Sequence, residues 1–156
     1  VLAALERAGC TLTQQNGMLR LRCSRLRAAG PIRTAPYDGF PTDAQAPLMA
    51  AMAVAEGVTV FEENLFEDRF RHVPALRALG AHIHAARRYA VVTGVRELHG
   101  ASMTATDLRG GAALLLAALG AEGVTLLRDP GHIPRGYADL PGDLRTLGAD
   151  CITEKT

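Results

Sequence analysis

Ala55-Glu56-Gly57-Val58-Thr59 is repeated without change as Ala121-Glu122-Gly123-Val124-Thr125, which lies 121 − 55 = 66 residues further along the chain. Each copy ends an apolar stretch that begins with a Thr-Asp pair, at Thr42-Asp43 and at Thr106-Asp107. Threonine and aspartate oxygens accept hydrogen bonds from the free amides at a helix start. The bodies of the two stretches, 44–55 and 112–121, are apolar nearly all round, which is typical of a helix buried on every side. The repeat therefore predicts two buried helices, each followed by a strand.

A second motif occurs three times, at Leu5–Gly9, Leu76–Gly80 and Leu144–Gly148. Each copy carries charged residues and ends at glycine, which adopts the left-handed conformation that commonly closes a helix. We therefore expect three outer, amphipathic helices, each followed by a strand. The expected strands after these helices are 11–14, 82–85 and 151–153. The expected hairpin partners are 18–23 and 89–93, and further short strands are expected at 32–34 and 102–105.

Together the two motifs indicate a structural unit of roughly 65–70 residues, longer than most solenoid repeats. Two such units, entered partway through the first, predict a pseudo-symmetric α/β domain. The 156 residues have the length of one ordinary domain. Because the first residue is Val1 and the pattern begins inside a unit, we expect the sequence to be a piece of a longer protein.

The amino-acid composition excludes several classes of protein. Hydrophobic residues make up 48% and charged residues 21%, as in ordinary globular proteins, and the net charge of +1 argues against a nucleic-acid-binding surface. The longest apolar run, 112–119, is too short to span a membrane, so no membrane partner is expected. Cys10, Cys23 and Cys151 form no metal-binding motif with histidine, which favours a reducing, cytoplasmic compartment and no bound metal. For each cysteine a small buried side chain is favoured over a reactive thiol.

Four short segments place charge where the fold does not need it: Gly39–Asp43, Leu65–Phe70, Thr106–Gly111 and His132–Tyr137. Each has an ordinary structural interpretation, as a helix cap, a solvated loop with an ion pair, a second cap and a surface turn. Each also has a functional interpretation, because carboxylates serve as general bases and arginines bind phosphate or carboxylate in two-pronged fashion. A helix that begins with small residues and an arginine is in addition a natural anion site. The candidate residues predict an anion-binding cleft with carboxylates; they are Asp43, Asp107, Arg69, Arg109 and Arg135.

In this order and spacing, the four segments resemble the C-terminal half of the UDP-N-acetylglucosamine enolpyruvyl transferase family, over essentially the whole chain. The resemblance implies an inside-out α/β barrel of the enolpyruvyl transferase type, built from repeated units with buried helices and outer sheets. It implies transfer of the enolpyruvyl group from phosphoenolpyruvate to the 3-hydroxyl of UDP-N-acetylglucosamine, with release of phosphate and no cofactor. In bacteria this step begins peptidoglycan synthesis.

The resemblance also implies roles for individual residues. Asp43 matches the aspartate that contacts the sugar hydroxyl and is the candidate base, and Leu65 falls where the family makes a backbone contact to the nucleotide sugar. Arg69 matches an active-site arginine. Asp107 and Arg109 match the pair near the reacting carbon and the phosphoenolpyruvate anion. Arg135 matches the arginine that closes on phosphoenolpyruvate.

The sequence departs from the family pattern at Pro134, where aspartate is usual, and at Arg71, where an apolar residue is common. The family's catalytic loop and its N-terminal Lys and Asn belong to the other domain, and residues 1–156 contain no match to them. We therefore expect residues 1–156 to supply part of an active site and to be inactive alone. Two alternatives stay open: a non-catalytic or degenerate nucleotide-sugar-binding fragment, and a relative of 5-enolpyruvylshikimate-3-phosphate synthase.

Overall fold

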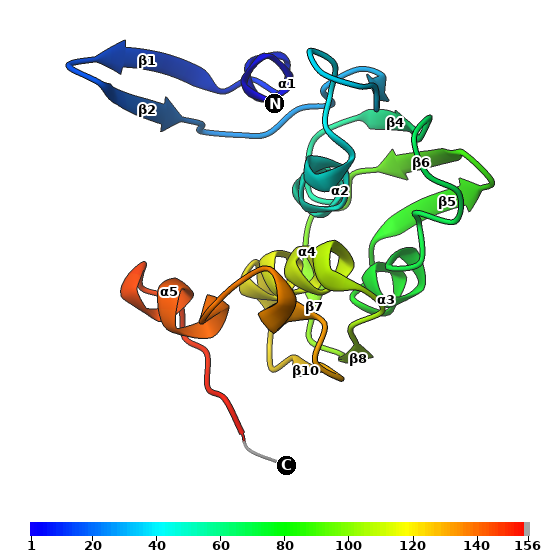
Figure 1. The fold of residues 1–156 in the computed structure, drawn as a ribbon, viewed down its shortest axis with the longest axis vertical. Helices are drawn as coiled ribbons and strands as arrows, with labels where there is room; N and C mark the ends of the chain where they lie inside the picture. Colours follow the sequence, from blue (N-terminus) through cyan, green and yellow to red (C-terminus); the bar gives the residue numbers. More distant parts are fainter. Residues whose placement is uncertain (155–156) are drawn as a thin grey trace.

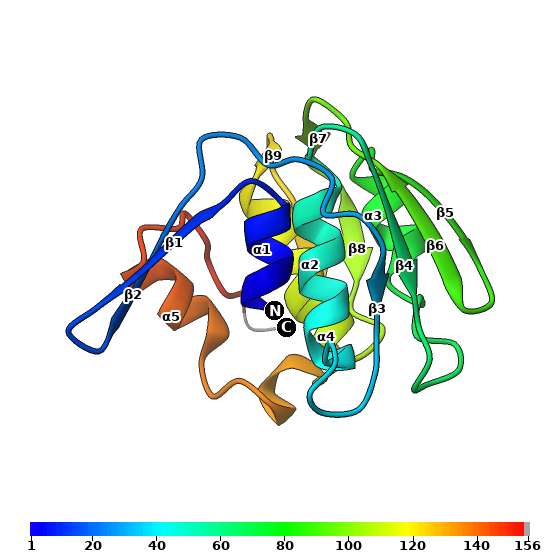
Figure 2. The ribbon, with the colours of Figure 1, turned by 90° about the horizontal axis from the view of Figure 1, so that it is seen from above.

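The computed structural model describes residues 1–154 and arranges them as helices packed between small outer sheets (Figures 1 and 2). The helices are α1 (Leu2–Arg7), α2 (Gln45–Met52), α3 (Val73–Ala78), α4 (Leu108–Leu119) and α5 (Leu140–Thr146), with 3₁₀ turns η1 (Thr42–Ala44) and η2 (Ile133–Arg135). The strands are β1 (Thr11–Gln15), β2 (Met18–Arg22), β3 (Ile32–Arg33), β4 (Val58–Glu62), β5 (His82–Ala86), β6 (Tyr89–Thr93), β7 (Leu98–His99), β8 (Ser102–Thr104), β9 (Ala121–Glu122) and β10 (Leu126–Arg128).

Helices α2 and α4 form the centre of the molecule and pack against each other. The side chains of Met49 and Met52 on α2 and of Leu114 on α4 are essentially inaccessible to solvent. These are the two helices that follow the Thr-Asp pairs, and their buried positions confirm the prediction that apolar helices form the core.

A four-stranded sheet of order β3-β4-β6-β5 covers one side of these helices. The β1–β2 hairpin lies on the side of α1 that faces away from this sheet (Figure 2). Phe61, Ile83 and Val92 alternate with exposed residues along the sheet and point into the core. In the second unit, two further parallel pairs form, β8 with β10 and β7 with β9. The sheets therefore lie outside the two central helices α2 and α4.

The prediction that a glycine closes each of the three amphipathic helices is confirmed. Gly9, Gly80 and Gly148 have φ values of 90°, 94° and 94°, the left-handed conformation that other residues adopt only with strain. Each lies just after a short amphipathic helix, and the strands expected after the first two are present as β1 and β5. The predicted hairpin partners are present as β2 and β6.

Several local predictions are wrong. No strand forms at 151–153, because within the described residues no neighbouring strand pairs with that segment. The central helices end earlier than predicted, at Met52 and Leu119, and Ala121–Glu122 is strand β9 paired with β7. By contrast, segment 132–137 contains the turn η2, which agrees with its interpretation as a surface turn.

Two predictions of burial are also wrong. Helix α4 is not buried on every side: Leu116 and Leu119 are exposed, since no described element packs on that face. Cys23 is exposed and Cys151 half-buried, and only Cys10 is a buried side chain, because the β1–β2 hairpin leaves its second strand in solvent. None of the helices formed by residues 1–154 has the length and hydropathy of a membrane span.

Candidate functional site

Asp43 lies between two arginines that are distant from it in sequence. Its Oδ1 accepts a hydrogen bond from Arg69 Nη2 at 3.1 Å, and its Oδ2 accepts one from Arg109 Nη2 at 2.8 Å. The Asp43 side chain is 56% exposed, against 23% for Arg69 and 27% for Arg109. One accessible carboxylate is therefore held by two half-buried cations.

The two arginines determine the electrostatics of this carboxylate. The hydrogen bond from Arg109 lowers the pKa of Asp43 most; partial burial opposes it, and the charges of Arg109 and Arg69 lower the pKa further. The same hydrogen bond raises the pKa of Arg109, with help from Tyr137. Asp43 is therefore ionised and a good acceptor for a hydroxyl, and while both arginines hold it, it is a weak base.

Asp107 uses its carboxylate differently. As the N-cap of α4 it accepts hydrogen bonds through Oδ1 from the amides of Arg109, at 3.1 Å, and Gly110, at 2.8 Å. Burial raises the pKa of Asp107, but the Gly110 amide, the Thr106 hydroxyl and the charges of Arg69 and His72 together lower it. Since Asp107 already occupies these two amides, the start of α4 is not the open anion site that the sequence suggests.

His72 lies beneath the start of α4 and is fully buried, and within residues 1–154 neither of its ring nitrogens has a hydrogen-bond partner. A Cβ atom added at Gly110 would come within 3.1 Å of His72 Cβ, so glycine allows the helix to approach this closely. Burial lowers the pKa of His72 to about 4; the charge of Arg69 also lowers it, while Asp107 opposes the shift. The imidazole is therefore neutral, and its charged neighbours Asp107 and Arg69 both belong to the candidate site.

Glu63 is a buried carboxylate that ties two of the candidate segments together. Its Oε2 accepts a hydrogen bond from the Thr42 hydroxyl at 2.9 Å, next to Asp43. Its Oε1 accepts from the amides of Leu65 and Phe66, at 2.9 and 3.1 Å, and from the Thr34 hydroxyl at 2.8 Å. A buried charge needs such partners, and this one fixes the loop after β4 against the start of η1.

The fourth segment packs on the start of α4 through η2. A Cβ atom added at Gly111 would come within 2.8 Å of Ile133 Cγ1, so glycine leaves room for the Ile133 side chain against the helix. Tyr137 Oη accepts a hydrogen bond from Arg109 Nη1 at 3.1 Å, and its ring centroid lies 5.6 Å from the Arg109 guanidinium carbon. Arg135 is exposed on η2, and among the described residues it makes no ion pair.

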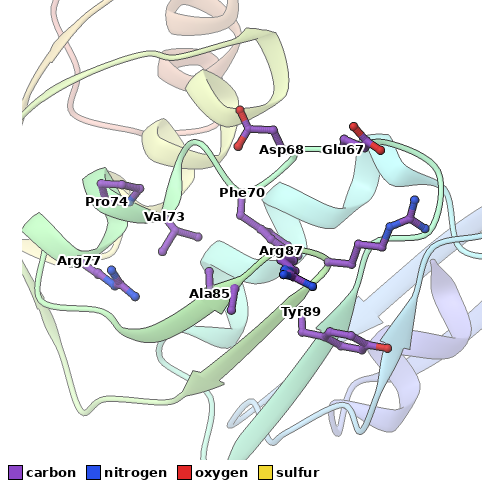
Figure 3. A pocket seen from close by; sticks show the side chains of 11 residues that line it. Glu67, Asp68, Phe70, Val73, Pro74, Arg77, Ala85, Arg87 and Tyr89 are labelled. Carbon is purple, nitrogen blue, oxygen red and sulfur yellow. The ribbon is translucent and has the colours of Figure 1, made fainter.

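A cavity of about 920 Å³ lies between the loop at 67–70, helix α3 and the β5–β6 turn (Figure 3). Phe70, Val73 and Pro74 form apolar parts of its lining, and Glu67 and Arg77 contribute charge. None of the six predicted site residues lines it. The predicted chemistry therefore lies outside this cavity, around Asp43.

The structure thus brings Asp43, Arg69 and Arg109 into contact and places Asp107 beside them at the start of α4. Leu65 lies partly exposed in the loop that Glu63 holds, and Arg135 stands apart on η2. Sequence reasoning missed Glu63, His72 and the hydroxyl of Tyr137. The acidic pair Glu62-Glu63 at the end of an apolar strand is an unusual pattern and could have pointed to Glu63. The sequence does not show, however, which of the two glutamates is buried.

Comparison with known proteins places this geometry in context. The family model described as EPSP synthase (3-phosphoshikimate 1-carboxyvinyltransferase) matches residues 1–144. The chain is 48% identical over 151 residues to the UDP-N-acetylglucosamine 1-carboxyvinyltransferase of Myxococcus xanthus, covering 97% of this chain and 36% of the relative. It is also 48% identical over 149 residues to UDP-N-acetylglucosamine 1-carboxyvinyltransferase 1 of Caldanaerobacter subterraneus subsp. tengcongensis, covering 96% of this chain and 36% of that protein. The chain therefore spans about a third of the length of these relatives.

Solved structures agree on the architecture. The enolpyruvyl transferase NikO from Streptomyces tendae superimposes with a TM-score of 0.86 at 36% identity, over 96% of this chain and 35% of that one. EPSP synthase from Acinetobacter baumannii superimposes with a TM-score of 0.71 at 19% identity, over 98% of this chain and 36% of that one, which is a likeness of fold alone. The fold predicted from the sequence, part of an α/β barrel of the enolpyruvyl transferase type, is confirmed.

Proposed function

Since the chain belongs to the EPSP synthase (3-phosphoshikimate 1-carboxyvinyltransferase) family, we propose that it supplies part of the active site of a UDP-N-acetylglucosamine 1-carboxyvinyltransferase. The reaction is transfer of the enolpyruvyl group of phosphoenolpyruvate to the 3-hydroxyl of the nucleotide sugar. The single observation that carries this proposal is the Asp43 carboxylate held between Arg69 and Arg109. It combines an acceptor for a sugar hydroxyl with cations for an anionic co-substrate.

In the proposed reaction the sugar hydroxyl adds to C2 of phosphoenolpyruvate and passes its proton to a base. As the oxygen bonds to C2, C3 takes up a proton and the double bond becomes a single bond, which gives a tetrahedral intermediate. Loss of phosphate from C2 together with a proton from C3 then restores the double bond. Arg109 and Arg135 bind the phosphoenolpyruvate anion, and Asp107 lies near the reacting carbon. Fixed cations stabilise the negative charge that develops in the transition state.

Asp43 is the proposed base. Its pKa is low while Arg109 donates to it. When Arg109 turns to the co-substrate anion, that hydrogen bond is lost and the pKa of Asp43 rises toward a value better suited to proton transfer. Anion binding would in this way prepare the base that takes the proton of the sugar hydroxyl as its oxygen attacks the bound phosphoenolpyruvate.

We further propose that residues 1–156 are the C-terminal portion of the enzyme and that another domain carries the catalytic loop. Coverage of about a third of each relative supports this. Pro134 stiffens the turn next to Arg135, in the first turn of η2. The complete enzyme would act in the cytoplasm, and its product would enter cell-wall synthesis, on which cell shape and division depend.

A chimera tests the proposal: residues 1–151 replace the matching segment of the Myxococcus xanthus relative, and phosphate release from phosphoenolpyruvate is measured. We expect release with UDP-N-acetylglucosamine and none with shikimate 3-phosphate, and the isolated chain should release none. Activity with shikimate 3-phosphate instead would assign the chain to the other branch of the family. A folded chimera that is inactive with both acceptors, beside an active parent, would indicate a degenerate segment.

A further inference from the structure

Cys10 and Cys23 lie just beyond the open end of the β1–β2 hairpin. The ladder pairs Thr11 with Arg22 and ends at Gln15 and Met18, which flank the turn. Continuing the same register by one residue pairs Cys10 with Cys23. Both thiols are free.

The position of this pair in the ladder brings its side chains close. A two-residue turn closes on a hydrogen-bonded pair, and hydrogen-bonded and non-hydrogen-bonded pairs then alternate. Counting from Gln15 and Met18, the sixth pair, Cys10 and Cys23, is of the non-hydrogen-bonded kind. Such pairs have Cα atoms about 4.5 Å apart and the closer side chains. That spacing lies within the range of about 4.4–6.8 Å that a disulfide needs.

The chain on either side keeps the two residues together. The amide of Arg27 donates to Ala8 O at 2.9 Å, so the segment after Cys23 continues alongside the end of α1. The Cys10 amide donates to Leu5 O at 3.0 Å, which anchors the other partner. Burial raises the pKa of the Cys10 thiol, and a hydrogen bond to Cys23 and the charge of that residue raise it further.

The two thiols differ in access. Cys10 is buried, whereas Cys23 is exposed and lines a surface cavity of about 540 Å³ together with Gly9, Thr11 and Arg22. Arg22, which also lines the cavity, directly precedes Cys23 and its side chain is exposed, whereas the exposed Arg25 is paired with Glu56 at 3.5 Å. An approaching small disulfide therefore meets Cys23 first, in surroundings that favour an anion.

We propose that Cys10 and Cys23 form a thiol–disulfide exchange site that takes small anionic disulfides, of the glutathione type, and closes to an intramolecular cross-strand disulfide. The Cys23 thiolate attacks the S–S bond of the small disulfide, forming a mixed disulfide and releasing one thiolate. Cys10 then loses its proton to solvent and attacks the Cys23 sulfur, which releases the second thiolate. The protein loses two hydrogens and the small disulfide is reduced to two thiols.

The experiment treats the purified protein with glutathione disulfide, blocks remaining thiols with iodoacetamide and maps tryptic peptides without reduction. Cleavage after Arg7, Arg20, Arg22 and Arg25 places Cys10 in peptide 8–20 and Cys23 in peptide 23–25. We expect these two peptides to be recovered linked, and Cys151 to be alkylated in its own peptide. Linkage of Cys23 to Cys151, or a glutathione that stays on Cys23 in the native protein, would overturn the proposal.

Matched variants separate the two steps. Cys10→Ala should stop the reaction at the mixed disulfide on Cys23, Cys23→Ser should leave Cys10 unmodified, and Cys151→Ser should behave as the parent. Each variant's circular dichroism spectrum confirms that it is folded. The exchange with glutathione disulfide should slow several-fold at high salt, while that with the neutral 2-hydroxyethyl disulfide should not. Modification of Cys10 in the folded Cys23→Ser variant would show that Cys23 is not the point of entry.

Discussion

At the start of α4, Asp107 folds back on its own helix and accepts the amides of Arg109 and Gly110. At the start of η1 and α2, 106 − 42 = 64 residues earlier, the same Thr-Asp pair makes no side-chain cap, and Asp43 extends away to bind Arg69 and Arg109. The neighbours explain the difference. Thr42 donates its hydroxyl to Glu63, which holds the helix start, and leaves the carboxylate of Asp43 for the arginines. One dipeptide thus serves stability in one unit and the proposed chemistry in the other.

The largest effect is expected from removing the charge of Asp43 in the active chimera. Asp43→Asn should lower kcat/KM by about 10²–10⁴-fold, the usual contribution of a positioned general base. The free energy of unfolding should change by less than about 1 kcal/mol, because the ion pairs of Asp43 are exposed. Phosphate-release kinetics and urea unfolding measure the two quantities. A large loss of stability with little loss of activity would reverse the roles assigned to the two aspartates.

A pH titration of stability distinguishes the surroundings of the two helix starts. His72 lies under α4, with Asp107 and Arg69 as its charged neighbours, and its folded pKa of about 4 is below the ordinary 6.5. Between these pH values the unfolded chain binds the proton and the folded chain does not, so stability is complete above 6.5 and is lost as the pH falls toward 4. The loss should reach about 3 kcal/mol.

Urea unfolding from pH 7 to pH 4 measures this loss, with His72→Gln as the variant that cannot titrate in this range. Other carboxylates contribute to both proteins at the lower pH values, so the quantity of interest is the difference between the two curves. Parallel curves would mean that His72 does not carry the proton linkage. A difference that grows below pH 6.5 supports a neutral imidazole beneath α4.

The caps themselves can be compared by truncation. Asp107→Ala should destabilise the chain by about 1–2 kcal/mol because two amides at the start of α4 lose their acceptor. Asp107→Ser should restore most of that loss, since serine is also a good N-cap. Asp43→Ala should cost well under that amount. Equal losses at the two positions, measured by urea unfolding, would remove the distinction between them.

The smallest effect is expected from the ion pair that links the two units. In a double-mutant cycle of Asp43→Asn and Arg109→Gln, the coupling in unfolding free energy should be below about 1 kcal/mol, because Asp43 is more than half exposed. The same cycle on kcat/KM in the chimera should show strong coupling, since both residues act on one reaction. Coupling in stability well above this value would mean that the pair holds the units together.

Local signals in the sequence were enough for much of the fold. The glycine after each amphipathic helix, the alternation of Ile83 and its neighbours, and the Asp107 cap each depend on residues within one helical turn or one strand. Two predictions that needed a distant neighbour failed. The segment at Cys151 had strand-forming residues without a described partner strand, and Leu116 had an apolar side chain without a described surface to cover it.

The sequence by itself determined which residues could carry the chemistry, because their spacing in four motifs is local information. It also determined that two apolar helices would form the centre. Only the tertiary structure decided that Asp43 receives both arginines while Asp107 caps its helix, and that Glu63 and His72 are buried between the motifs. The contacts of Glu63 with Thr42 and of Asp43 with Arg69 and Arg109 join groups 21, 26 and 66 residues apart in the chain, and packing brings such groups to hydrogen-bond distance.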